Sequence, residues 1–271
     1  VFNRGDHPVI VFERDGRFVK SWGEGIFKRP HGIHIGPDDS VYCTDDVDHT
    51  VRKCTLDGKV LFTLGTSGVP SDTGIVGLDY RTIRKGCPPF NRPTNVALAA
   101  DGSIYVSDGY GNARVHKFAP DGKLLFSWGE PGAGPGRFNL PHGIAVDSQG
   151  RVFVAIRENS SIQIFSPTGD FLAEWTDTSR PMQVFIDPDD NVYVAEVGTR
   201  AGMFPWNPTP PNPLGARLSI FDRAGKLLCR WGGGADPTAV GDFFASHDVW
   251  VDRHGDIYVG EVVMSAGGNK G

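Results

Sequence analysis

The chain alternates between short runs of β-forming residues and turn signals. Between positions 141 and 175 there are four such runs, Ile144–Asp147, Val152–Ile156, Ser161–Phe165 and Phe171–Trp175. Gly, Pro, Asn and Ser separate them, and these residues favour turns because of their backbone preferences and short polar side chains. Runs of this length, bounded in this way, predict a four-stranded antiparallel unit.

The same unit recurs along the chain. Its opening residue is found at Pro30, Pro93, Pro141, Pro181 and Ser246. Its closing run recurs as Phe18–Trp22, Leu124–Trp128, Phe171–Trp175 and Leu227–Trp231. A four-stranded unit repeated at roughly 40 residues is a propeller blade. We therefore predict an all-β, NHL-type β-propeller that spans residues 1–271 as a single domain.

The number of blades depends on the two ends of the chain. Val1–His7 reads as a second strand, followed by third and fourth strands at Val9–Phe12 and Phe18–Trp22. The last unit ends after its second strand, near Val262. A closed ring has six blades if the two incomplete units are separate, and five if they join. We favour six, because of the histidines described next.

Histidine follows the opening residue in every second unit. Around the ring this position is His31, Thr94, His142, Met182 and His247. In a six-bladed ring a pseudo-threefold axis relates the three histidine-bearing blades, so their imidazoles would converge on the channel. Three neutral imidazoles with an open coordination position form a catalytic zinc site. The alternative is that Pro-His-Gly is a common repeat opening whose histidine caps a turn.

A second set of equivalent positions lies at the end of the second strand and in the turn beyond it. It contains Arg4, Asp45, Asp108, Arg157, Glu196 and Glu261, with Tyr110 shortly after Asp108. We expect Asp45, Glu196 and Glu261 to bind neighbouring backbone amides. Arg4 and Arg157 interrupt the acidic pattern, and guanidinium groups near a metal would hold a substrate carboxylate. A surface salt bridge is the alternative for each arginine.

The composition argues against several classes of function. The net charge is −5 and the basic residues are scattered, which argues against nucleic acid as a partner. The four cysteines lack C-x-x-C spacing, so we expect free thiols. No apolar stretch is long enough to cross a bilayer, so we expect a soluble protein without a membrane partner. Compartment and oligomeric state stay open.

Two inserts, Gly65–Arg92 and Gly198–Arg217, are expected to form a rim or lid on the face that carries the chemistry.

Several motifs carry a family resemblance: FNRGDH, PHGI, SDGYGNARV, LPHGIAV, RENSSIQIF and HDVWV. With these residues the sequence resembles the peptidyl-α-hydroxyglycine α-amidating lyases over nearly its whole length. The resemblance implies a six-bladed propeller with zinc on His31, His142 and His247. It also implies that Arg4 and Tyr110 activate the substrate and that Arg157 binds its carboxylate.

The resemblance further implies a structural calcium ion, with the Asp248 carboxylate and the Ile33 carbonyl among its ligands. The family reaction cleaves an N-acyl hemiaminal into a primary amide and glyoxylate. A base removes the carbinol proton, and of Tyr110 and Arg4 we favour Tyr110, because arginine holds its proton strongly.

The sequence departs from the family at Asn91 and Gly111, which replace a disulfide pair, and at Ala245, which replaces a methionine near the third histidine. These departures leave the substrate open between a peptide and a smaller hemiaminal. Two other functions remain: a non-catalytic NHL scaffold that binds proteins, and a metal-dependent propeller hydrolase of amides, esters or lactones.

Overall fold

The computed structural model describes residues 1–200 and 210–266. Within these ranges the regular structure consists of β-strands and two short 3-10 helices, without an α-helix. The described residues accordingly contain no helix of the length and apolarity needed to span a bilayer. The chain divides into two compact units, Val1–Pro141 and His142–Gly271, and each is described by itself.

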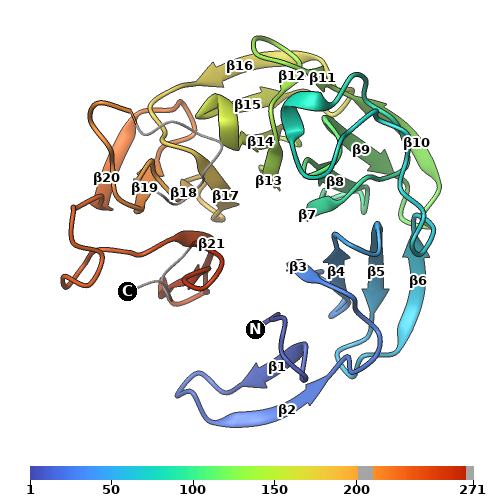
Figure 1. The fold of residues 1–271 in the computed structure, drawn as a ribbon. Coiled ribbons are helices and arrows are strands. Elements are labelled where there is room, and N and C mark those ends of the chain that lie inside the picture. The colour runs from blue at the N-terminus through green and yellow to red at the C-terminus, as the bar shows by residue number, and fades with distance from the viewer. Residues whose placement is uncertain (201–209, 267–271) are drawn as a thin grey trace. The chain divides into compact units, whose positions relative to one another are not determined.

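The first unit contains two four-stranded antiparallel sheets whose strands follow the order of the sequence (Figure 1). One sheet consists of β3 (Pro30–Ile35), β4 (Val41–Asp45), β5 (Thr50–Cys54) and β6 (Val60–Leu64), and the other of β7 (Pro93–Leu98), β8 (Ile104–Asp108), β9 (Arg114–Phe118) and β10 (Leu124–Trp128). The smaller elements are β1 (Val9–Phe12) with β2 (Phe18–Trp22), η1 (Tyr80–Thr82), and the parallel pair β11 (Glu130–Pro131) with β12 (Arg137–Phe138).

The second unit repeats this plan. One four-stranded sheet consists of β13 (Pro141–Val146, whose first residue is the last of the first unit), β14 (Val152–Ile156), β15 (Ser161–Phe165) and β16 (Phe171–Trp175), with η2 (Arg157–Asn159) after β14. The next consists of β17 (Pro181–Ile186), β18 (Val192–Glu196), β19 (Arg217–Phe221) and β20 (Leu227–Gly232), and a two-stranded sheet of β21 (Ser246–Val251) and β22 (Ile257–Glu261) follows.

The all-β propeller architecture is confirmed, with four complete four-stranded blades in the described residues. The six-blade count and the single domain stay predictions. Most strand bounds also match the pattern of the sequence: β14, β15 and β16 begin and end where the runs of β-formers do. The four cysteines are free thiols, as expected.

The first strand of each blade begins earlier than predicted. The β-formers placed it at Ile144, but β13 begins at Pro141, so the Pro-His-Gly opening belongs to the strand. In β3, β7, β17 and β21 the pairing with the second strand shifts just after the opening residue. Such a β-bulge leaves one residue without a partner and redirects its side chain. The residue after the opening position therefore lies at an irregular point of the strand.

The prediction that Val1–His7 forms a strand is wrong. Only Phe2 pairs, through a single bridge to Val9. The Asn3 side chain accepts a hydrogen bond from the Gly5 N–H at 2.7 Å and donates one to the His7 carbonyl at 2.8 Å. Asparagine competes with extended structure by closing local turns of this kind. The segment therefore bends instead of continuing as a strand.

Carboxylates at the end of the second strand hold the segment that leads into the first strand. Asp45 accepts the backbone N–H groups of Lys28 and Arg29, at 2.5 and 3.0 Å. The same arrangement recurs at the ends of β8, β18 and β22, where Asp108 accepts from Asn91, Glu196 from Ser179, and Glu261 from Phe244 and Ala245. The expectation that Asp45, Glu196 and Glu261 bind backbone amides is therefore confirmed.

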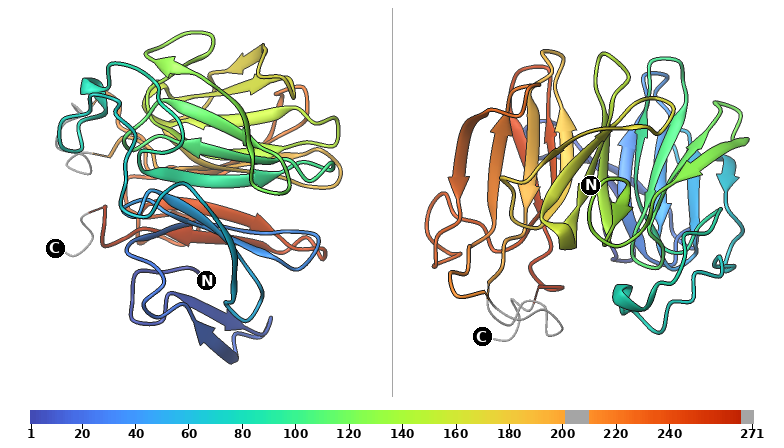
Figure 2. Two further views of the ribbon diagram at one scale, coloured as in Figure 1. Left: turned by 90° about the vertical axis from the view of Figure 1, so that its right-hand side faces the viewer. Right: turned by 90° about the horizontal axis from the view of Figure 1, so that it is seen from above.

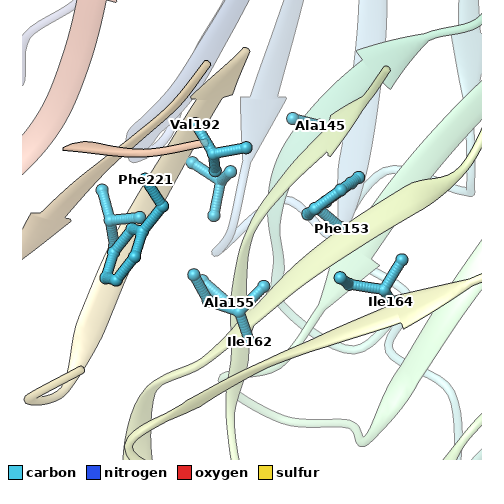
Figure 3. Close-up of a cluster of buried hydrophobic side chains, with 9 residues drawn as sticks. Ala145, Phe153, Ala155, Ile162, Ile164, Val192 and Phe221 are labelled. Atoms are coloured by element: carbon cyan, nitrogen blue, oxygen red, sulfur yellow. The ribbon is translucent and has the colours of Figure 1, made fainter. Parts of the chain in front are cut away.

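Neighbouring blades of the second unit share an apolar core (Figure 3). Phe153 and Ala155 of β14 and Ile162 and Ile164 of β15 pack with Val192 and Phe221 of the next blade. Trp175, at the end of β16, packs against the same cluster. A Cβ atom on Gly225, in the β19–β20 turn, would lie 2.6 Å from the Trp175 ring, so this turn needs glycine. The recurrent closing tryptophan therefore packs against the next blade.

The first insert lies beyond one end of the strands of its unit (Figure 2, cyan). It is anchored where the family resemblance places a disulfide. The Asn91 side chain donates to the Ser71 carbonyl at 2.9 Å, and Thr73 Oγ1 donates to the Gly111 carbonyl at 2.6 Å. Hydrogen bonds thus connect the two positions. Residues 201–209, which include most of the Pro-rich core of the second insert, lie outside the described residues.

Replacement of Gly143 by alanine should destabilise the second unit. A Cβ atom there would lie 2.6 Å from the Met182 carbonyl oxygen and 2.6 Å from the Gln183 Cα, and neither backbone atom can move aside alone. We expect a loss of about 1–3 kcal/mol in the free energy of unfolding, measured by denaturant titration. Gly260→Ala is the matched control, because its nearest neighbour would be 3.4 Å away. Equal effects of the two substitutions would contradict this account.

Candidate functional site

His31 lies on the first strand of its blade, with each ring nitrogen near a different partner. Nδ1 is 2.7 Å from the Thr94 carbonyl oxygen, and Nε2 is 3.0 Å from the Tyr110 hydroxyl. A carbonyl oxygen can only accept, so Nδ1 carries the proton in the neutral ring. Nε2 then presents its lone pair, to the Tyr110 hydroxyl or to a metal ion.

Tyr110 lies in the loop after β8, in the same unit as His31. The ring centroids of Tyr110 and His31 are 5.0 Å apart, with the rings nearly perpendicular at 82°. The backbone N–H of Tyr110 donates to the Arg92 carbonyl at 3.4 Å. The structure therefore brings together Tyr110 and His31, which belong to two different sets of repeat positions in the sequence.

Arg4 lies beside the same strand. Its Nε donates to the Pro30 carbonyl at 3.2 Å, so the guanidinium is anchored at the residue before His31. The remaining part of the side chain is exposed. Arg4, His31 and Tyr110 are thus gathered at one end of β3.

In the second unit, His142 and His247 lie against each other. Their ring centroids are 4.8 Å apart and the rings are nearly perpendicular, at 83°. His142 is buried, and its Nδ1 lies 2.7 Å from the Met182 carbonyl oxygen. By the argument used for His31, Nδ1 carries the proton and Nε2 presents a lone pair.

His31 and His142 share one arrangement across the repeat. Each binds, through Nδ1, the carbonyl of the residue at the same position of the next blade, which is Thr94 for His31 and Met182 for His142. Metal-binding histidines are usually held in this way, because a carbonyl partner fixes the tautomer and raises the basicity of the other nitrogen. These side chains are therefore suited to bind a metal ion through Nε2.

His31 belongs to the first unit, and His142 and His247 to the second, so the three-histidine zinc site stays a prediction. The same holds for the calcium ligands Ile33 and Asp248. Burial raises the pKa of Asp248 to about 6, against hydrogen bonds from the Gln183 side chain and the Val249 N–H.

Arg157 is buried and ion-paired. It begins η2, and its Nε donates to Glu158 Oε1 at 2.7 Å. Arg180 donates to the same carboxylate oxygen. Burial alone would raise the pKa of Glu158, but the charges of Arg157 and Arg180 outweigh it and lower that pKa. Two guanidiniums therefore share one carboxylate.

The surface salt bridge considered for Arg157 is thus wrong, because the pair is buried; the role of Arg157 in binding a substrate stays a prediction. His49 is 8% exposed, in a left-handed conformation with φ 57°, and its Nδ1 accepts the Arg92 N–H at 3.1 Å.

A model of the NHL repeat matches residues 90–118 and 138–165. NHL repeat-containing protein 3 of Homo sapiens is 35% identical over 201 residues, which are 69% of this chain and 54% of the relative. The chain spans about half the length of the human and mouse proteins of that name.

Peptidyl-alpha-hydroxyglycine alpha-amidating lyase 1 of Drosophila melanogaster is 32% identical over 173 residues, 59% of this chain and 29% of the relative. Among solved structures, a gluconolactonase from Xanthomonas campestris superposes with a TM-score of 0.60 at 14% identity, covering 93% of this chain and 75% of the other. At that identity the superposition shows the fold alone.

Glu158→Gln should destabilise the protein at neutral pH, because it removes the charge of the carboxylate that two buried guanidiniums share. We expect a loss of about 3–5 kcal/mol in the free energy of unfolding. The lowered pKa of Glu158 means that its contribution is complete above the carboxyl pKa of the unfolded chain and disappears as pH falls through the folded pKa. The unfolding midpoints of wild type and variant should therefore differ at pH 7 and converge at acidic pH. A difference that persists in acid would contradict the assignment.

Proposed function

The chain belongs to the NHL-repeat propeller family, and we propose that it is a zinc-dependent carbon–nitrogen lyase. Its substrate would be an N-acyl hemiaminal of the α-hydroxyglycine type, and its products a primary amide and glyoxylate. The observation that carries the proposal is the shared tautomer of His31 and His142, each fixed by a carbonyl of the next blade. Relatives named as amidating lyases support the reaction class.

In this proposal the Nε2 atoms of His31, His142 and His247 hold the metal in a six-bladed ring. A zinc ion bound there would act as a Lewis acid toward the carbinol oxygen of the substrate. The contact between His142 and His247, with ring centroids 4.8 Å apart, is compatible with two ligands of one ion.

Tyr110 is the proposed base. The bond between its hydroxyl and His31 Nε2 places the phenol oxygen beside a metal ligand. The pKa of Arg29 is raised, first by hydrogen bonds to Asp46 and also by negative charge on Tyr110, and Arg29 would in turn stabilise a tyrosinate. Arg4, bound to the Pro30 carbonyl, would orient the substrate at the same strand end.

The proton balance is as follows. Tyr110 takes the carbinol proton, the oxygen lone pair forms the aldehyde C=O, and the C–N bond breaks. Tyr110, which acts as the phenolate, then passes this proton to the leaving amide nitrogen, so the products are a neutral amide and glyoxylate and Tyr110 returns to its starting state. Arg157, paired with Glu158 and therefore fixed in direction, would bind the carboxylate of the hydroxyglycine part.

A non-catalytic scaffold is the second candidate. NHL repeat-containing protein 3 is similar over a longer part of this chain than the fruit-fly lyase is, and its name specifies no activity. A scaffold needs neither the metal nor the shared tautomer, so metal content separates the two functions. A metal-dependent hydrolase would keep the metal and release no glyoxylate.

Metal content is the first measurement. We expect about one zinc per chain by elemental analysis of the wild type, and a loss of zinc in His142→Ala. His254→Ala is the control, because His254 is an exposed histidine in the β21–β22 turn. A wild-type protein that contains no metal and takes none up when zinc is added would leave the scaffold as the better account.

Tyr110→Phe should keep the zinc and lose turnover. Removal of the hydroxyl leaves His31 Nε2 available to the metal but takes away the base, so we expect roughly a 10²–10⁴-fold lower kcat. Glyoxylate release from N-acetyl-α-hydroxyglycine measures turnover, and elemental analysis measures zinc. Unchanged turnover with full zinc occupancy would exclude Tyr110 as the base.

A further inference from the structure

Arg92 and Arg180 occupy equivalent positions in two blades. Each precedes the opening proline of a first strand, in a left-handed conformation with φ of 66° and 52°. Each donates its backbone N–H to a side chain of the preceding blade. The acceptor is His49 Nδ1 at 3.1 Å for Arg92, and Ser160 Oγ at 3.2 Å for Arg180.

The two arginines differ in their counter-charge. Arg180 pairs with Glu158, which lies two residues after the end of β14. Two residues after the end of β4, the corresponding position is Val47. Arg92 thus lacks the carboxylate that neutralises Arg180. Within residues 1–200 and 210–266, its guanidinium forms no ion pair, although the residue is half-buried.

The charges around Arg92 leave a positive surplus. The carboxylate whose charge acts on it is that of Asp46, but Arg29 already holds Asp46 through two hydrogen bonds, one of them 2.6 Å long. The pKa of Arg92 is lowered, first by burial and then by the charge of Arg29, and Asp46 only partly opposes this. A bound anion would remove this electrostatic cost.

The backbone of Arg92 contacts that of the proposed base. The Arg92 carbonyl accepts the Tyr110 N–H, and Arg29, whose charge acts on Arg92, also interacts with Tyr110. Arg157 and its partners, which belong to the second unit, are already assigned to the hydroxyglycine carboxylate. Arg92 is a further cation near Tyr110, and we therefore expect the substrate to carry a second anionic group that pairs with it.

We propose that the Arg92 guanidinium binds a carboxylate on the acyl side of the substrate. The inference rests on the proposed lyase function and narrows its substrate class to N-acyl-α-hydroxyglycines with an acidic acyl group. N-succinyl-α-hydroxyglycine is the simplest member of this class. Recognition would be a charge-assisted hydrogen bond, which arginine forms with carboxylates in a fixed, bidentate geometry.

The test compares N-succinyl- with N-acetyl-α-hydroxyglycine by glyoxylate release. We expect the wild type to prefer the succinyl compound by roughly 10–100-fold in kcat/KM, the size expected for one hydrogen bond to a charged group. Arg92→Gln should lose this preference and keep its activity toward the acetyl compound. The control Arg223→Gln removes an equal charge from an exposed turn and should keep the preference. An unchanged preference in Arg92→Gln would overturn the proposal.

A second measurement separates this inference from the lyase function. Succinamate, the amide product expected from the succinyl compound, can be titrated calorimetrically without turnover. We expect about tenfold weaker binding to Arg92→Gln than to wild type or Arg223→Gln. Equal binding to all three overturns the subsite. If neither substrate releases glyoxylate, the lyase proposal fails and this titration alone decides the subsite.

Arg92→Gln should fold, because Leu140 adopts the same conformation at the equivalent position, with φ of 65°. Unfolding midpoints of wild type and variant should therefore agree. A marked drop in stability would point to a structural role of Arg92, and Arg92→Lys would then show whether positive charge alone restores succinamate binding. A stable Arg92→Lys that does not restore binding would count against the subsite.

Discussion

The arrangement of the site depends on a carboxylate at the end of the second strand, which is present in three of the four complete blades. Asp45, Asp108 and Glu196 are completely buried, and a buried carboxylate is tolerated only when hydrogen bonds replace its hydration. Backbone N–H groups of the segment leading into the first strand supply these bonds. The carboxylate therefore fixes where the first strand begins, and the bulge that follows directs the second residue, which is His31 in one blade and His247 in another.

On this fixed backbone, single side chains decide what each blade contributes. Arg92 and Arg180 share a conformation and a backbone hydrogen bond, yet Arg180 is ion-paired and Arg92, within the part of the chain that the structure describes, is not. The difference comes from Glu158 in one blade and Val47 in the other. A repeat protein can thus change the charge at a site by one substitution while the surrounding hydrogen bonds stay in place.

The sequence predicts the strands well because turn residues bound short runs of β-formers, as in Val152–Ile156 and Ser161–Phe165. The start of the first strand escapes this reasoning, since proline and glycine disfavour a strand and only the bulged pairing accommodates them. Local hydrogen bonding explains the bend at Asn3, which the apolar pattern does not reveal.

Within the candidate site, the repeat predicted His31 and His142 at equivalent positions, and the family resemblance added Tyr110; their roles stay predictions. The sequence did not reveal the bond from Arg180 to Glu158, which joins residues 22 positions apart on different blades. That pairing depends on the three-dimensional packing of the blades. The placement of the two units, which determines whether His31 joins His142 and His247, is likewise not contained in the repeat pattern.

The bond from each imidazole to the next blade has a consequence for how the molecule behaves as it loosens. The carbonyls of Thr94 and Met182 polarise rings that belong to the preceding blades. The electron-donating strength of Nε2 therefore depends on the hydrogen bond between two blades. If the packing between two blades loosens, this hydrogen bond is lost and Nε2 becomes a weaker electron donor, even while the strands stay formed. Retention of a bound ion would therefore report on how closely neighbouring blades pack.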